Sequence, residues 1–226
     1  MKNIADTCEM NAMAEHHPTL RNSIPVKSEQ EFQQDQTQLV RASVYELLGR
    51  LLASEPDEAT LQSLREIGEI DASDGPLAMG WQLMKQAARK TDVQAVRDEY
   101  FSLLIGVGRG ELVPFGSWYI TGFLMEKPVA VLRADLKRLG IERQAGVVES
   151  EDHIAALCDA MAIIIRNGDE ISLSTQQAFF ADHLAPWVQR LFSDMQGARC
   201  AHFYRSVGFF GESFFDFEDQ LLRMQS

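Results

Sequence analysis

Residues Glu149 to His153 combine three carboxyl groups with one imidazole immediately before an apolar segment. Acidic side chains in the first turn of a helix stabilise it through its macrodipole by about 0.3–1 kcal/mol, so helix capping accounts for the acids. It does not account for His153, because an imidazole is favoured at the opposite end of a helix. We therefore expect Asp152 and His153 to have a role beyond capping.

A second candidate for chemistry is the glycine-rich run from Gly106 to Gly110. Glycines let backbone N–H groups approach a phosphate, so a nucleotide-binding protein or small nucleotide hydrolase is one alternative. The spacing matches neither a dinucleotide fingerprint, which needs a preceding strand, nor a P-loop, which needs Gly-Lys-Ser/Thr. This loop therefore supports the alternative only weakly.

Other catalytic arrangements lack support in the sequence. His16 with His17, and Cys200 with His202, are the nearest approaches to a metal-binding pair, and neither has the spacing of a zinc site. The chain has no Gly-x-Ser-x-Gly elbow that would expose a serine nucleophile. We expect no enzyme activity, no metal and no cofactor.

The charge balance favours a basic partner. The 226 residues carry a formal net charge of -12, which repels nucleic acid and anionic lipid and attracts basic ligands. The three cysteines, Cys8, Cys158 and Cys200, form neither a disulfide framework nor a zinc pattern, as in a reducing compartment. With no apolar run long enough to span a membrane and no export signal, we expect a cytoplasmic protein without direct membrane insertion.

The elements that position these residues are predicted to be helices. Apolar residues recur at helical spacing along most of the chain, and runs of strict two-residue alternation are missing. A short helix is also expected to begin near Ser117, which would cap it. The predicted fold is all-α, a bundle of about ten helices in two subdomains joined by a hinge. The main helical segments are 36–53, 61–67, 81–88, 93–104, 128–139, 154–165, 179–192 and 203–222.

The expected organisation has three parts. Residues 1–35 lack periodicity and are predicted to be a mobile tail. Two helical subdomains, 36–143 and 144–226, meet at a glycine-containing hinge within 140–148. Because such a hinge permits domain swapping, both a monomer and a swapped dimer are compatible with the sequence.

Three motifs in a fixed order make the chain similar to a known family. Residues 100–106 (YFSLLIG), 114–119 (PFGSWY) and 149–153 (ESEDH) resemble the signature segments of the TorD/DmsD family of redox-enzyme maturation chaperones. The resemblance continues through 183–187 and Phe203-Tyr204, and so covers the chain from Gln36 to its end. The sequence departs from the family pattern at Leu104, Phe115 and Ser150.

The resemblance implies a function and a set of site residues. The function is that of a cytoplasmic chaperone for the twin-arginine signal peptide, or the apoprotein, of a molybdenum-cofactor oxidoreductase, which delays export until the cofactor is inserted. An acidic carboxylate, Asp152 or Glu149, would pair with an arginine, and aromatic and aliphatic side chains would cover the apolar stretch. A purely structural assembly subunit is a further alternative. The residues implied for client binding are Tyr100, Leu103, Leu104, Pro114, Phe115, Gly116, Ser117, Tyr119, Glu149, Asp152 and His153.

Overall fold

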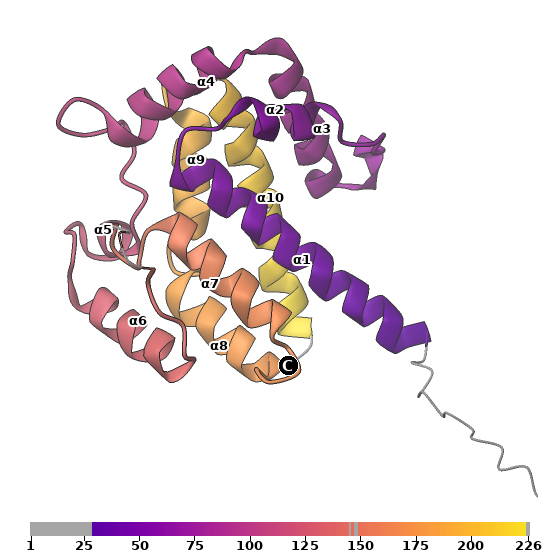
Figure 1. Ribbon diagram of the computed structural model, residues 1–226, viewed down its shortest axis with the longest axis vertical. Helices are drawn as coiled ribbons and strands as arrows, with labels where there is room; N and C mark the ends of the chain where they lie inside the picture. The colour runs from indigo at the N-terminus through magenta and orange to yellow at the C-terminus, as the bar shows by residue number, and fades with distance from the viewer. Residues whose placement is uncertain (1–28, 145, 147–148, 225–226) are drawn as a thin grey trace, which may run out of the picture.

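The computed structural model describes residues 29–144, 146 and 149–224, and these residues form ten α-helices, one 3-10 helix and one π-helix (Figure 1). Within the described residues there is no strand, only an isolated antiparallel bridge between Phe115 and His153. The predicted all-α fold is therefore confirmed. The helices are α1 (Glu29–Ala53), α2 (Glu58–Arg65), η1 (Ala72–Asp74), α3 (Pro76–Lys90), α4 (Val93–Tyr100), the π-helix η2 (Phe101–Ile105), α5 (Gly116–Thr121), α6 (Lys127–Arg138), α7 (Ile154–Arg166), α8 (Leu173–His183), α9 (Val188–Gly197) and α10 (Phe203–Met224).

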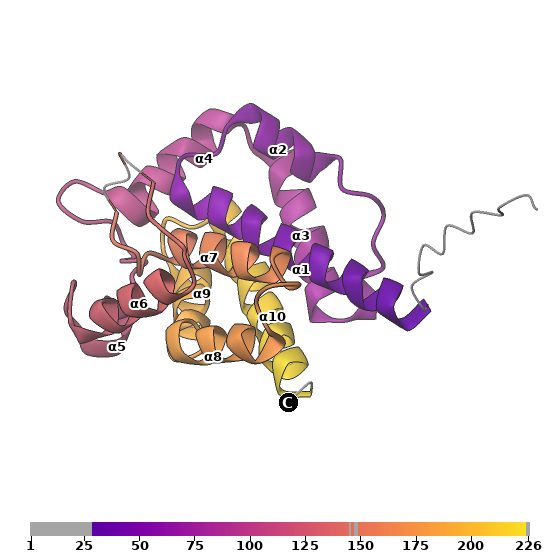
Figure 2. The ribbon, with the colours of Figure 1, turned by 60° about the horizontal axis from the view of Figure 1, so that its bottom comes forward.

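Two long helices organise the packing. Helix α1 packs along α7, while α10 packs against α9 and also against α3. Figures 1 and 2, which differ by a 60° turn, both show α5 and α6 together at one end of the molecule. The buried apolar side chains of α1, α3, α7, α9 and α10 form one core cluster, so the helices on both sides of residue 143 share a core.

The described residues cover only part of the predicted tail and of the predicted hinge. Residues 1–28 of the predicted tail, which include His16 and His17, lie outside the described residues, whereas 29–35 begin helix α1. Residues 145 and 147–148 of the predicted hinge also lie outside them. A hinge between two subdomains is not confirmed, and the boundary at 143 stays a prediction, as does domain swapping.

A buried ion pair joins α1 to α10. Arg41 Nε lies 2.6 Å from Glu218 Oε1, and Nη2 lies 2.8 Å from Oε2, with both side chains almost fully buried. Tyr45 donates its hydroxyl to Glu218 Oε2 at 3.0 Å, and Gln176 of α8 accepts from Arg41. Because each charge has several partners, the network is satisfied in the interior and ties three helices together.

The start of α10 is capped by a carboxylate from a distant helix. Glu99 of α4 accepts hydrogen bonds from the backbone N–H groups of His202, Phe203 and Tyr204, at 2.6–3.0 Å. The first N–H groups of a helix have no partner within it, and a negative charge at that end is favourable. Glu99 therefore anchors α10 on α4.

We predict that Glu218→Gln lowers the free energy of unfolding by about 3–5 kcal/mol, because it leaves the buried Arg41 charge without its counter-ion. The matched control is Glu46→Gln, since Glu46 pairs with Arg166 at the surface, where both side chains are exposed. Loss of that pair should cost at most about 1 kcal/mol. Urea unfolding measures both values, and equal losses would contradict a structural role for the buried network.

Candidate functional site

The two motifs singled out in the sequence meet in one backbone junction. Ile154 donates its N–H to Pro114 O, and Gly116 donates to Asp152 O, both at 2.9 Å. These bonds flank the antiparallel bridge between Phe115 and His153. The segments 114–119 and 149–153, which are separated by about a seventh of the chain, are thus fastened side by side at the starts of α5 and α7.

Asp152 fastens the junction with its side chain. Its Oδ2 accepts a hydrogen bond from the backbone N–H of Ser117 at 2.8 Å, and only 3% of the residue surface is exposed. The carboxylate thereby caps the first turn of α5. The expectation that Ser117 itself caps this helix was wrong, because the α5 cap residue, Phe115, makes no side-chain cap and the acceptor comes from Asp152.

A hydrogen bond to the backbone explains why the imidazole of His153 stands at the start of α7. Its Nδ1 accepts a hydrogen bond from the N–H of Ala155 at 3.2 Å, so the ring is the N-cap of α7. Burial lowers the pKa of His153 to about 4, although Glu149 and Asp152 act in the opposite direction. The ring is therefore neutral near pH 7, and the helix macrodipole does not repel it.

Ser117 connects the junction to the loop that follows α5. Its Oγ accepts a hydrogen bond from the N–H of Met125 at 3.2 Å, and its backbone oxygen accepts one from Thr121 Oγ1 at 2.8 Å. Met125 has a positive φ of 60°, which is uncommon for a residue with a side chain. The hydrogen bond to Ser117 thus holds the loop after α5 in a conformation that it would not favour alone.

Tyr119 of α5 contacts Trp187, in the turn before α9, and Asp194 of α9. Tyr119 stacks on Trp187 with ring centroids 5.5 Å apart, and its hydroxyl lies 3.2 Å from Asp194 Oδ2. Burial is the main cause that raises the pKa of Tyr119 above its ordinary value. A Cβ on Gly116 would come within 3.1 Å of Trp187 Nε1, so glycine permits this close packing.

The glycine run closes a tight loop beside α5. A Cβ on Gly110 would lie 2.5 Å from the Leu104 carbonyl carbon, and Gly106 has a φ of +64°. The guanidinium of Arg109 lies over the Trp118 ring, 4.9 Å from its centroid. The run follows a π-helix rather than a strand. Close backbone packing accounts for Gly106 and Gly110, and a φ of +87° accounts for Gly108, so nothing in the geometry of these glycines favours the nucleotide alternative.

Most of the residues implied for client binding are buried. Glu149 is exposed, and Phe115 and Tyr119 are half-buried. The rest shape the junction and its support and present little side-chain surface to a partner. The buried set is Tyr100, Leu103, Leu104, Pro114, Gly116, Ser117, Asp152 and His153.

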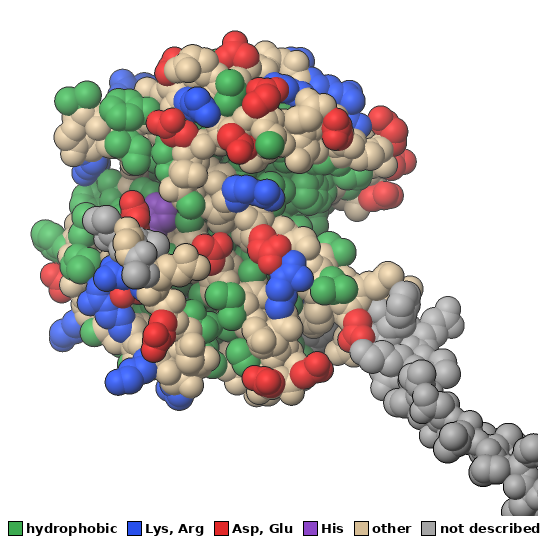
Figure 3. Space-filling model, viewed as in Figure 1, with side chains coloured by type: hydrophobic (Ala, Val, Ile, Leu, Met, Phe, Trp, Pro, Cys, Tyr) green, Lys and Arg blue, Asp and Glu red, His purple; other side chains and the backbone are tan. Residues whose placement is uncertain are grey.

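The sequence reasoning missed a group of exposed apolar side chains around this junction, which we term the apolar rim. Figure 3 shows hydrophobic side chains along the left edge of the molecule, where Figure 1 places the loop after α4 and the loop after α5. Helical spacing alone does not tell an exposed apolar residue from a core one, so no sequence signal separated this group. The rim consists of Phe101, Ile105, Val107, Ile120, Phe123, Leu124 and Met125.

Negative charge lies close to the same junction. Burial, followed by the charges of Glu149 and Glu55, raises the pKa of Tyr100 to about 12. Glu149 also acts on His153. Both glutamates are exposed, and neither makes an ion pair with another described residue. The junction therefore combines an apolar surface with accessible carboxylates.

The described part of the chain contains neither a metal-binding cluster nor a membrane-spanning helix. No group of three or more His, Cys, Asp or Glu side chains could hold a metal ion there. No helix among those residues is long and apolar enough to cross a membrane.

We predict that His153 makes the folded state less stable as the pH falls. Below the ordinary histidine pKa of about 6.5 the unfolded chain takes up a proton that the folded chain does not accept until about pH 4. The free energy of unfolding should therefore decrease across this window, by up to about 3 kcal/mol from this group. His153→Asn keeps a side-chain acceptor for Ala155 and removes the titration. Urea unfolding at a series of pH values should show a shallower decrease for the variant, and parallel curves would contradict the assignment.

Comparison with known proteins identifies the family of the chain from its sequence. No curated protein sequence matches the chain significantly. A solved structure of a proposed redox enzyme maturation protein from Archaeoglobus fulgidus is 19% identical, covers 88% of this chain and 99% of its own, and superposes with a TM-score of 0.48. The sequence profile of the nitrate reductase delta subunit family matches residues 70–193, more than half of the chain. The chain therefore belongs to that family, which comprises TorD-like redox-enzyme maturation chaperones.

Proposed function

We propose that this maturation chaperone binds the twin-arginine signal peptide, and through it the apoprotein, of an exported molybdenum-cofactor oxidoreductase. Binding in the cytoplasm would delay export until the cofactor is inserted. The single observation that carries this proposal is the apolar rim beside exposed carboxylates, on a surface built by the family's own motifs. A signal peptide that couples two arginines to an apolar stretch has the matching chemistry.

The apolar rim suits the hydrophobic stretch of such a peptide. Phe123 is 69% exposed and Leu124 is 50% exposed, and contact with an apolar ligand would remove this surface from water. Most rim side chains stand on the loops that follow η2 and α5. Loop-borne apolar side chains, including a flexible methionine, adapt to varied sequences. This adaptability suits a ligand that is defined by hydrophobicity rather than by exact sequence.

Glu149 is the carboxylate that we assign to the arginines. An arginine guanidinium forms its strongest contacts with a carboxylate that it can reach. Asp152 is almost fully buried and already accepts the Ser117 N–H, whereas Glu149 is exposed beside the same junction. Glu55, whose charge also acts on Tyr100, is exposed and is assigned to the second arginine. In this assignment Asp152 supports the site, and Glu149 and Glu55 contact the ligand.

We predict that Glu149→Gln weakens the binding of a twin-arginine peptide by about twofold to fivefold, since an exposed ion pair contributes up to about 1 kcal/mol. Replacing both peptide arginines with glutamine should weaken binding too, and Glu149→Gln should then have no further effect. Calorimetric titration at low salt measures the four affinities. The matched control is Glu170→Gln, an exposed glutamate after α7. Additive losses in the two series would contradict contact between Glu149 and an arginine.

We predict that the double variant Phe123→Ser, Leu124→Ser lowers the affinity for the same peptide at least about tenfold, because two exposed apolar side chains no longer cover its apolar stretch. Its free energy of unfolding should stay within about 0.5 kcal/mol of the parent value, since both side chains are exposed. Met79→Ser is the control, an exposed apolar residue on α3 outside the rim. Unchanged binding by the double variant, or an equal loss in the control, would refute the role of the rim.

A further inference from the structure

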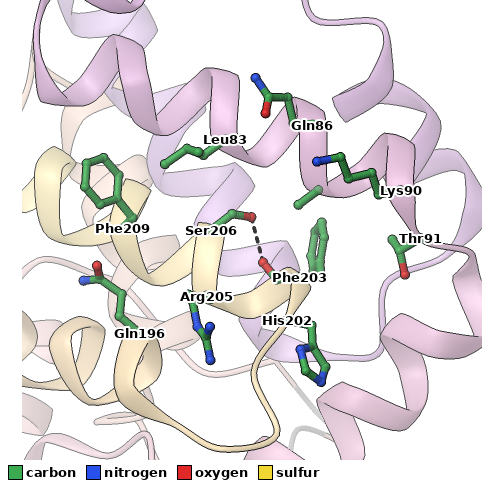
Figure 4. Close-up of a pocket in the computed structure, with 11 residues that line it drawn as sticks. Leu83, Gln86, Lys90, Thr91, Gln196, His202, Phe203, Arg205, Ser206 and Phe209 are labelled. Atoms are coloured by element: carbon green, nitrogen blue, oxygen red, sulfur yellow. Dashed lines mark hydrogen bonds between the residues drawn. The ribbon is translucent and has the colours of Figure 1, made fainter.

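A groove lies on the protein surface apart from the junction and the apolar rim. It has a volume of about 560 Å³ and runs between α3, the end of α9 and the start of α10 (Figure 4). None of its lining residues belongs to the apolar rim or to the two motifs of the candidate site. The proposed binding of a signal peptide therefore leaves this groove without an assigned use.

The walls of the groove are two helix stripes of similar length. On α3 the lining residues Leu83, Ala87 and Lys90 stand at helical spacing, and on α10 the lining residues Phe203, Ser206 and Phe209 do the same. Each stripe covers about two helical turns, or about 11 Å. That length matches two turns of a partner helix laid along the groove.

The floor of the groove is apolar because its hydroxyls are already used. Ser206 donates its hydroxyl to Phe203 O at 2.7 Å, which Figure 4 shows as a dashed line. Thr91 Oγ1 lies 3.4 Å from Asp92 O. Between these hydroxyls, Leu83, Ala87 and Phe209 contribute carbon surface to the groove. A small inorganic anion would gain nothing from that surface, whereas an apolar stripe would.

Both walls also carry an unpaired positive charge. Figure 4 shows Lys90 extending from α3 and Arg205 from α10. Neither makes an ion pair or side-chain hydrogen bond with any residue that the structure describes, and no Asp or Glu lines the groove. In a chain of net charge -12, a groove with cations on both sides and no acid is complementary to an acidic ligand.

We propose that this groove docks an acidic amphipathic helix of a partner polypeptide. The apolar stripe of that helix would lie on Leu83, Ala87 and Phe209, and carboxylates on its two flanks would pair with Lys90 and Arg205. The chemistry is opposite to that of a basic signal peptide, so each surface selects against the ligand of the other. The chain thereby has two separate docking surfaces that two segments of partner polypeptide occupy at once.

The test uses the full chain and a synthetic helical peptide labelled with fluorescein. The peptide has leucine at i, i+3, i+4 and i+7 and glutamate on both flanks, and its comparison peptide has glutamine in place of glutamate. We expect the parent chain to bind the glutamate peptide at least about tenfold more tightly than the glutamine peptide at low salt. Lys90→Glu with Arg205→Glu should abolish that preference, and Leu83→Gln should weaken both peptides.

The control separates local pairing from net charge. Lys127→Glu with Lys137→Glu changes the net charge equally, on exposed positions of α6 that do not line the groove. It should leave the preference within about twofold of the parent. Urea unfolding establishes that each variant is folded, which is expected because all five side chains are exposed.

Four results would overturn the proposal. They are the absence of any preference for glutamate in the parent chain, an equal loss in the α6 control, displacement of the peptide by citrate, and a dimer that Lys90→Glu with Arg205→Glu abolishes. Citrate displacement would assign the groove to a small anion, and loss of a dimer in sedimentation would assign it to a second copy of the chain. A failure of twin-arginine peptide binding would leave these measurements unaffected, so the two proposals are tested independently.

Discussion

The hydrogen bond from the Ser117 N–H to the Asp152 carboxylate is the contact on which the geometry of the candidate site depends. It closes the junction between the starts of α5 and α7, which the backbone bonds of Pro114 and Gly116 extend. Ser117 then holds Met125 through its hydroxyl, and so the loop that carries much of the apolar rim. Through these hydrogen bonds, the buried carboxylate of Asp152 fixes the positions of exposed side chains that it does not contact.

The helices were predictable because their apolar residues repeat with the helical period. The predicted segment 36–53 lies within α1, and 128–139 overlaps α6 almost completely. The proximity of the motifs at 114–119 and 149–153 did not follow from any period, and the family resemblance implied only that both contribute to client binding. The backbone hydrogen bonds from Ile154 to Pro114 and from Gly116 to Asp152 supply its physical basis.

What the sequence could not predict was burial. The position of Asp152 at a helix start indicates a surface acid. In the structure it is buried, and its carboxylate accepts a hydrogen bond from the first turn of α5. In the sequence Phe123 is an ordinary apolar residue, yet 69% of its surface is exposed. The pair of Arg41 and Glu218 spans most of the chain, and no local pattern links two such positions. Each of these properties depends on tertiary neighbours that spacing does not encode.

Hydrogen exchange of the whole chain, with and without a twin-arginine peptide, tests the central claim most directly, because it locates the bound surface without any substitution. The account predicts slower exchange for amides in 101–110 and 116–126 and around Glu149, because the ligand covers these loops, and no change along the groove of α3 and α10. Protection confined to that groove, or to neither surface, would contradict the account.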